Sequence, residues 1–181
     1  MKVTRTDIPD VLLLEPPVFA DGRGHFLETY NRRKFRDATG VDAEFVQDNQ
    51  SVSKHRVLRG LHYQIKQPQG KLVRAIVGEV YDVVVDIRRR SPTFGKWTAV
   101  TLSAERNNLL WVPAGFAHGF LVLSENAVVQ YKVTDYWAME HERCIVWNDR
   151  QLAIPWPLKG DPVVNEKDAL GSSLASADLF D

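Results

Sequence analysis

Cysteine is almost absent from this sequence of 181 residues, and so is any long apolar run. The one cysteine, Cys144, excludes an internal disulfide framework and a zinc-ribbon ligand set. The longest apolar run near the start, 11–14, is far shorter than the apolar region of a signal peptide or a membrane span. Together these absences predict a cytoplasmic protein with no membrane partner.

An excess of one charge is also missing, because 23 Lys and Arg residues balance 23 Asp and Glu residues. Nucleic-acid-binding domains usually carry a marked basic excess, so we expect no nucleic-acid partner. The basic runs 32–34 and 88–90 are interpreted as solvated turns. With 44% hydrophobic and 25% charged residues, the chain has the composition of a globular protein, and its length predicts a single domain over 1–181.

Short runs rich in Val, Ile, Tyr, Phe and Trp, separated by Gly, Pro, Asn and Asp, predict an all-β sandwich or barrel. The run Val83-Val84-Val85 lacks polar alternation, so we expect strands covered on both faces by a second sheet or by another subunit. Asn31 is expected to cap a short helix that runs to Ala38 before Gly40, and a helical turn should follow Asn165. The tail 171–181 is expected to be loosely held. The predicted strands are 11–15, 25–30, 43–53, 57–64, 71–77, 80–87, 96–103, 108–112, 117–122, 127–134 and 145–148.

The strand 57–64 has an unusual composition for a structural strand. His62 and Gln64 lie on one face of it, because side chains on a strand point to opposite faces in turn. Gly60 lacks a side chain beside the histidine, so a ligand or another backbone can come close there. Lys71 follows soon after, next to Gly70. We therefore expect this stretch to form one wall of a binding or catalytic site.

Other stretches also place polar residues in apolar surroundings. His118 begins an apolar strand just after a Pro/Gly turn, Tyr131 lies inside a strand, and Asp168 follows Asn165 near the end of the chain. Cys144 follows His141 closely, which would suit a nucleophilic pair. We interpret Cys144 instead as a small buried residue that leads into the apolar stretch 145–147.

Short motifs at 21–28, 45–49, 57–64, 78–83, 91–95 and 113–120 closely resemble those of the dTDP-4-dehydrorhamnose 3,5-epimerases, in the expected order from about Ile8 to Asp168. The resemblance implies a cupin jelly-roll β-sandwich with a few short peripheral helices, assembled as a homodimer, with no cofactor and no metal. It also implies the substrate dTDP-4-dehydro-6-deoxy-D-glucose, which this family converts to dTDP-4-dehydro-L-rhamnose by inverting C3 and C5.

The residues suit this chemistry. A C–H next to a ketone is weakly acidic, so its removal needs a base and a group that stabilises the oxyanion, and inversion needs an acid on the opposite face. By resemblance, His62 is the base, Asp168 orients and stabilises it, and Tyr131 is the acid. Lys71 and His118 match groups near the sugar carbonyl and its enolate.

The resemblance also assigns substrate contacts. Arg59, with Arg23 from the partner chain, would bind the diphosphate, for which a guanidinium is well shaped. Phe26 and Trp137 would sandwich the thymine ring. Arg23, Phe26 and Glu28 are expected to complete the site of the partner chain. The remaining polar contacts to the nucleotide are Glu28, Gln47, Asn49, Glu142 and Lys167, and Lys71 is counted among the substrate contacts as well.

Three rival interpretations remain open. A metal-dependent cupin is disfavoured because Gln64 stands where such proteins carry a second histidine, which leaves only His62 and His118. A non-catalytic nucleotide-sugar binding module would not need an acid and a base on opposite faces. A mono-epimerase that acts on a related 4-keto sugar nucleotide fits the same residues.

Overall fold

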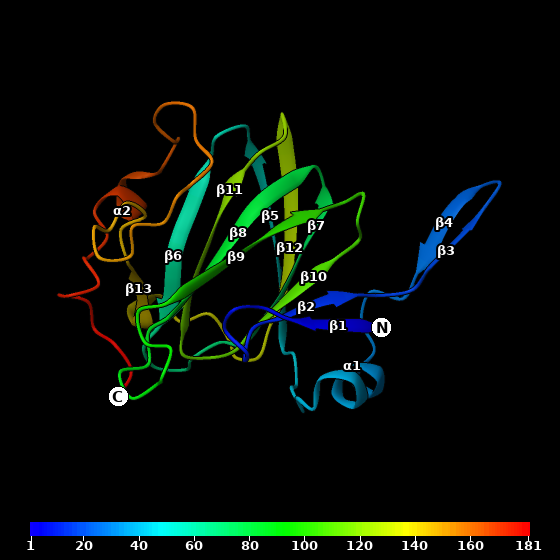
Figure 1. Ribbon diagram of the computed structural model, residues 1–181, viewed down its shortest axis with the longest axis horizontal. Helices are drawn as coiled ribbons and strands as arrows, with labels where there is room; N and C mark the ends of the chain where they lie inside the picture. The colour runs from blue at the N-terminus through cyan, green and yellow to red at the C-terminus, as the bar shows by residue number, and fades with distance from the viewer.

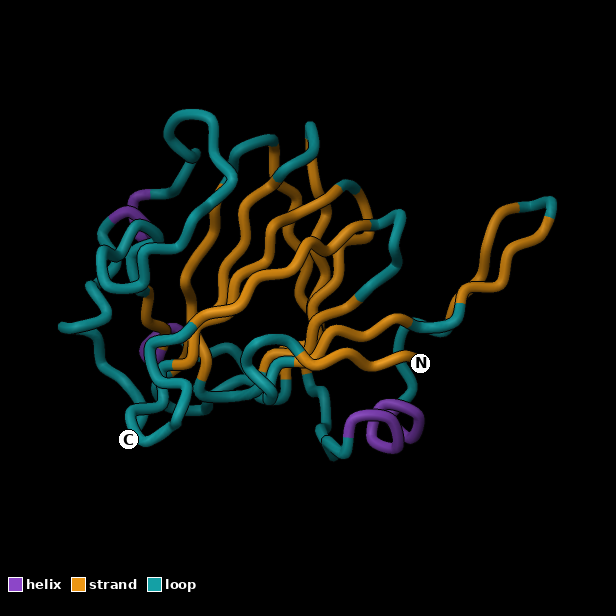
Figure 2. Tube along the Cα trace, viewed as in Figure 1, coloured by secondary structure: helices purple, strands orange, loops and turns teal.

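The alternating apolar strands form two antiparallel sheets that pack face to face, and a separate hairpin extends away from them (Figures 1 and 2). The computed structural model describes all residues, 1–181. This arrangement confirms the expected all-β sandwich with short peripheral helices. No helix in it is long and apolar enough to cross a membrane.

The strand order of the first sheet is β1-β2-β10-β7-β12-β5, formed by Lys2–Arg5, Leu12–Glu15, Leu109–Val112, Lys71–Val77, Asn126–Val133 and Gln47–Lys54. The order of the second sheet is β13-β6-β11-β8-β9, formed by Glu142–Cys144, Leu58–Gln64, Phe116–Val122, Glu79–Asp86 and Trp97–Ser103. The hairpin pairs β3 (Val18–Asp21) with β4 (Gly24–Leu27). The helices are α1 (Arg32–Thr39), α2 (Glu166–Ala169) and a 3-10 turn at Met139–His141.

The continuous apolar runs are covered on both faces, as expected. Val84 points into the core between the two sheets. Val83 and Val85 belong to a second buried cluster on the outer face of β8, together with Leu152 and Leu174 from the C-terminal part of the chain. The cover on that outer face is therefore supplied by the chain itself.

Both predicted helical segments are present with their caps. The Asn31 side chain accepts a hydrogen bond from the Lys34 N–H at the start of α1, and Gly40 ends the helix in the left-handed conformation at φ 74°. The buried ring of Phe35 attaches α1 to the first sheet. At α2, the Asn165 side chain accepts a hydrogen bond from the backbone N–H of Asp168, so the cap also holds a predicted site residue.

Several strand boundaries differ from the prediction. The strand expected over 43–53 begins only at Gln47, because Ala43 packs into the cluster around Phe35 instead of pairing with a neighbour. The strand expected over 145–148 is displaced to β13, where Glu142 pairs with Gln64 of β6. Strands β1 and β3 were not predicted. Pairing partners far along the chain decide these boundaries, and local composition does not reveal them.

The expectation of a loose tail at 171–181 was wrong. Leu174, Ala177 and Leu179 are buried in the cluster on the outer face of the second sheet. The backbone is held as well, because the N–H of Arg89 donates to the carbonyl oxygen of Phe180 at 2.8 Å. The small and polar residues that suggested a tail alternate with the apolar ones that anchor it.

Candidate active site

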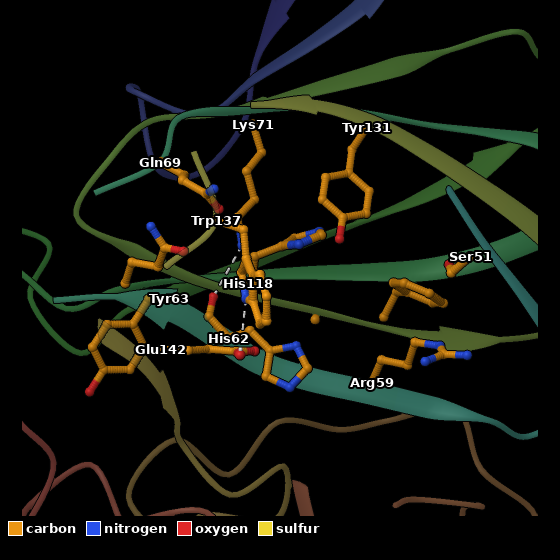
Figure 3. Close-up of a pocket in the computed structure, with 13 residues that line it drawn as sticks. Ser51, Arg59, His62, Tyr63, Gln69, Lys71, His118, Tyr131, Trp137 and Glu142 are labelled. Carbon is orange, nitrogen blue, oxygen red and sulfur yellow. Dashed lines mark hydrogen bonds between the residues drawn. The ribbon is translucent and has the colours of Figure 1, made fainter. Parts of the chain in front are cut away.

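A pocket of about 230 Å³ opens between the two sheets. Its floor comes from β6 and β11 of the second sheet, and its opposite wall comes from β5, β7 and β12 of the first sheet (Figure 3). The lining residues are Ser51, Arg59, His62, Tyr63, Gln64, Gln69, Lys71, His118, Gly119, Phe120, Tyr131, Trp137 and Glu142. Seven of the predicted site residues therefore share one cavity.

His62 and Asp168 form a hydrogen-bonded pair at the floor of the pocket. Nε2 of His62 lies 2.7 Å from Oδ1 of Asp168, and the Gly60 N–H donates to Oδ2 at 3.0 Å. Burial would raise the pKa of Asp168, but the hydrogen bond and charge of His62 and the Gly60 N–H lower it below its usual value. An ionised carboxylate only accepts, so in the neutral form of the ring Nε2 carries the proton and Nδ1 keeps a lone pair.

Gly60 is needed where β6 passes β11. Its φ is +110°, and a Cβ there would lie 2.6 Å from the carbonyl oxygen of His118. This confirms the expected close approach of another backbone. The pairing shifts by one residue at this point, from His118 opposite His62 to Phe120 opposite Arg59. Because such a bulge reverses the alternation, Arg59 lines the same pocket as His62, although strict alternation had placed them on opposite faces.

A second imidazole–carboxylate pair lies beside the first. Nε2 of the buried His118 is hydrogen-bonded to Oδ1 of Asp82 at 2.8 Å, and Asp82 is fully buried. Nζ of Lys71 reaches into the same region and donates to the carbonyl oxygen of His62 at 3.3 Å. Burial lowers the pKa of Lys71 to about 8, with partial compensation from Asp82 and Glu142. At neutral pH the pocket therefore holds a desolvated cation.

Tyr131 approaches from the other sheet. Its hydroxyl points into the cavity from β12, across from the His62 ring on β6 (Figure 3). Burial raises the pKa of Tyr131, the charge of Glu142 adds to this, and Arg59 opposes it. The phenol therefore stays protonated at neutral pH, and a base and a proton donor face one cavity from opposite walls.

Known proteins resemble this chain over nearly its whole length. The family model of dTDP-4-dehydrorhamnose 3,5-epimerase matches residues 5–176. A dTDP-4-dehydrorhamnose 3,5-epimerase of Pseudomonas aeruginosa is 62% identical over 180 residues, which cover 99% of each chain. The chain belongs to this family.

Solved structures of the epimerase family share the fold. The dTDP-6-deoxy-D-glucose-3,5-epimerase RmlC of Legionella pneumophila, in complex with dTDP-4-keto-L-rhamnose, superposes with a TM-score of 0.97 at 46% identity, over 99% of this chain and 97% of that one. ChmJ of Streptomyces bikiniensis, a 3'-monoepimerase in complex with dTDP-quinovose, superposes with a TM-score of 0.89 at 35% identity, over 95% of this chain and 87% of that one. The expected cupin-like sandwich is thus confirmed, and the fold accommodates both single and double epimerisation.

A hydrogen-bonded network lies at the mouth of the pocket. It is formed by polar residues that were assigned to the nucleotide by resemblance to the epimerases. Oε2 of Glu142 accepts hydrogen bonds from the Trp137 indole N–H at 3.2 Å and from Lys167 Nζ at 2.6 Å. The Gln47 side chain accepts from the Trp137 backbone N–H at 3.1 Å and donates to Asn49 at 2.8 Å. Trp137 remains 53% exposed, so its ring is free to stack on a planar ligand.

The residues predicted to serve the partner chain lie apart from this pocket. Arg23 and Phe26 are on the β3–β4 hairpin, which projects from the body of the molecule (Figures 1 and 2). The Phe26 side chain is 70% exposed, and Arg23 pairs only with Asp21, at 2.7 Å. Glu28 pairs with Lys34 of α1 at 2.9 Å. None of the three lines the pocket of its own chain.

Sequence reasoning missed Ser51, Gln69 and Asp82. Ser51 continues the alternation of Gln47 and Asn49 along β5, so the period of two could have placed it in the pocket. Asp82 interrupts the apolar strand β8, and a buried carboxylate needs a partner, which was a usable signal. Gln69 carried no comparable signal.

The interpretation of Cys144 was only partly right. Burial raises the pKa of its thiol to about 12, so it stays protonated and is not the activated nucleophile of a pair with His141. However, Cys144 is only half-buried, and it lies opposite His62 where β13 pairs with β6.

Proposed function

We propose that this protein is a cofactor-independent 3,5-epimerase that converts dTDP-4-dehydro-6-deoxy-D-glucose to dTDP-4-dehydro-β-L-rhamnose, in dTDP-L-rhamnose biosynthesis. The observation that carries the proposal is the placement of His62 and Tyr131 on opposite walls of one pocket in a member of this family. A ketosugar ring between them can lose a proton on one face and regain it on the other.

In the proposed mechanism, Nδ1 of His62 removes the proton from the carbon next to the ketone. Asp168 stabilises the imidazolium that forms. The electron pair moves onto the carbonyl oxygen, and the resulting enolate is stabilised by Lys71 and His118. Tyr131 then donates its proton to the opposite face of the carbon, which inverts it. Proton exchange with solvent then returns His62 to its neutral form and Tyr131 to its protonated form, and the same sequence at the second carbon completes the reaction.

The test is a proton NMR time course with dTDP-4-dehydro-6-deoxyglucose in deuterated water. Inversion with deuterium incorporation at both C3 and C5 is the expected result. Incorporation and inversion at one carbon alone would identify a mono-epimerase, and no exchange above the blank would identify a binding module. The cytoplasmic location stays a prediction.

The Arg59 guanidinium is proposed to bind the diphosphate. It lines the pocket and is held by Ser53 Oγ at 3.0 Å. Arg59→Ala should raise KM about 10- to 100-fold with kcat nearly unchanged, because a charged hydrogen bond contributes about 1.5–3 kcal/mol. Arg5→Ala, on the distant strand β1, is the control. An unchanged KM would show that the diphosphate lies elsewhere.

The buried cation Lys71 predicts a fall in activity on the alkaline side. With its pKa lowered to about 8, Lys71 is charged below that pH and neutral above it, so kcat/KM should decline as the pH rises through about 8. Lys71→Gln should be slower at every pH and should lack this decline. If kcat/KM of the variant declined in the same way at alkaline pH, the charge of Lys71 would not be the cause of the decline.

We propose that the β3–β4 hairpin of each chain completes the pocket of the other chain in a homodimer. Arg23, Phe26 and Glu28 are far from their own pocket, while the apolar side chains Phe19 and Phe26 are exposed on a projecting arm. Exposed aromatic residues on such an arm are typical of a protein interface. A homodimer that exchanges the two hairpins would place an arginine and an aromatic ring at each pocket.

Complementation between two variants tests this exchange. Arg23→Ala and His62→Ala chains, produced together with different tags, should form mixed dimers in which one pocket has intact His62 and an intact partner hairpin. If dimers form at random, about a quarter of the wild-type activity should return at low substrate concentration. If each hairpin serves its own chain, the mixture will show only the sum of the two separate variants.

A further inference from the structure

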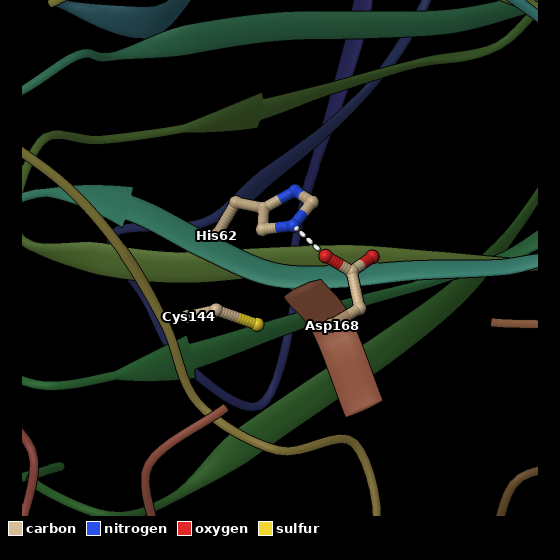
Figure 4. Close-up of side chains that lie close together, drawn as sticks. All are labelled: His62, Cys144 and Asp168. Carbon is tan, nitrogen blue, oxygen red and sulfur yellow. Dashed lines mark hydrogen bonds and ion pairs between the residues drawn. The ribbon is translucent and has the colours of Figure 1, made fainter. Parts of the chain in front are cut away.

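The Cys144 thiol lies close to His62 and Asp168, and the proposed mechanism does not use it. Cys144 of β13 lies opposite His62 of β6 in the strand pairing. Figure 4 shows its sulfur directed toward Asp168, below the His62–Asp168 hydrogen bond. One ligand atom from each of the three residues, a ring nitrogen of His62, a carboxylate oxygen of Asp168 and Sγ of Cys144, lies within 4.8 Å of the others, and Nε2 of His62 is the nitrogen in contact with Asp168.

This donor set and its spacing suit zinc. Zn²⁺ binds imidazole, thiolate and carboxylate in a tetrahedron, with bonds of about 2.0–2.3 Å that hold the ligand atoms roughly 3.3–3.7 Å apart. The His62–Asp168 contact of 2.7 Å would need to open by up to about 1 Å, and the sulfur, within 4.8 Å of the other two ligand atoms, would need to approach them by up to about 1.5 Å. The fourth position would be filled by water, as in open zinc sites.

We propose that His62, Cys144 and Asp168 form an inhibitory site for Zn²⁺. The metal binds Nε2 of His62, a carboxylate oxygen of Asp168 and the Cys144 thiolate, whose proton passes to solvent. The site then carries no net charge, because the two charges of the metal are balanced by one thiolate and one carboxylate.

The inhibition follows from the proton on the imidazole. Zinc takes the lone pair of Nε2, so a neutral His62 ring must carry its proton on Nδ1, the nitrogen that faces the pocket. That nitrogen can no longer accept a proton from a substrate. This step depends on the proposed role of His62 as the base, whereas metal binding itself does not.

Cobalt(II), added to the full protein without nucleotide, tests the binding. A thiolate ligand gives a sulfur-to-cobalt charge-transfer band in the near ultraviolet, and because the sequence has one cysteine, such a band can come only from Cys144. The wild type and the surface variant His55→Ala should show the band, Cys144→Ala should not, and Zn²⁺ should abolish it. No band in the wild type, or a band that Zn²⁺ does not displace, would overturn the site.

Zn²⁺ titration of deuterium exchange into the substrate tests the inhibition. Zn²⁺ should inhibit the wild type, and a chelator should restore activity. Cys144→Ala should need at least about tenfold more Zn²⁺, since even outer-shell partners of metal ligands change affinity by this factor. Equal sensitivity of the two proteins, or zinc binding without inhibition, would overturn the proposal.

Two further readouts keep these results interpretable. Cys144→Ser replaces Cys144→Ala if the alanine variant does not fold, as judged by circular dichroism. A cobalt band in a protein with no epimerase activity would contradict the proposed function but not the metal site. An active epimerase without the band would contradict the metal site but not the proposed function.

Discussion

Replacing His62 with alanine should lower kcat by about 10³- to 10⁴-fold, as expected for removal of a general base. The His62 ring has a carboxylate partner and a free nitrogen and lies across the pocket from Tyr131, so water would have to take its place as the base. Affinity for dTDP, measured by calorimetry, should change little. The nucleotide is assigned to Arg59 and to groups at the mouth of the pocket, and not to His62.

Two controls separate catalysis from folding in this experiment. His62→Ala leaves the buried Asp168 without its side-chain partner, which could destabilise the protein. His62→Gln supplies an amide donor for Asp168 but no base, and it should be equally inactive while unfolding closer to the wild-type temperature. The surface variant His55→Ala should be fully active. Near-normal turnover in either His62 variant would refute the base assignment.

Replacing Tyr131 with phenylalanine should lower the rate of net inversion about 10²- to 10³-fold, within the range for loss of a general acid. Exchange of substrate hydrogen with solvent at the His62 side should persist, because the base, its carboxylate and the groups near the enolate remain in place. Proton NMR in deuterated water measures both rates in one sample. Deuterium should therefore enter with retention of configuration much faster than with inversion.

The matched control is Tyr63→Phe. Tyr63 also lines the pocket, but its hydroxyl donates to the backbone carbonyl of Asp178 at 2.6 Å and points away from the cavity (Figure 3). This variant should keep both exchange and inversion. If Tyr131→Phe lost both rates to the same degree, Tyr131 would not be the acid.

Sequence patterns predicted features that depend on local chemistry. The unbroken Val83-Val84-Val85 run indicated a strand covered on both faces, and Asn31 with Gly40 marked the ends of α1. His62, Lys71 and Tyr131 were placed in a site by residue type and by resemblance to a family, and they do share one pocket.

Features decided by long-range pairing could not be predicted in this way. Resemblance to the family assigned Arg59 to the site, but a strict period of two placed its side chain on the face opposite to His62. It lines the pocket because the strand pairing shifts beside Gly60. Asp82 becomes a partner of His118 only when β8 and β11 lie side by side. Cys144 approaches Asp168 because β13 pairs with β6, and nothing near Cys144 in the chain indicates that neighbour.

The burial of the C-terminal segment matters for anyone who shortens this protein. The match to the family model ends at residue 176, which invites truncation at that boundary. Such a cut would delete Ala177 and Leu179 and uncover the outer side of β6, the strand from which His62 reaches the pocket. Expression tags and crystallisation variants should therefore leave the last residues intact, because these residues cover the outer side of the strand that carries His62.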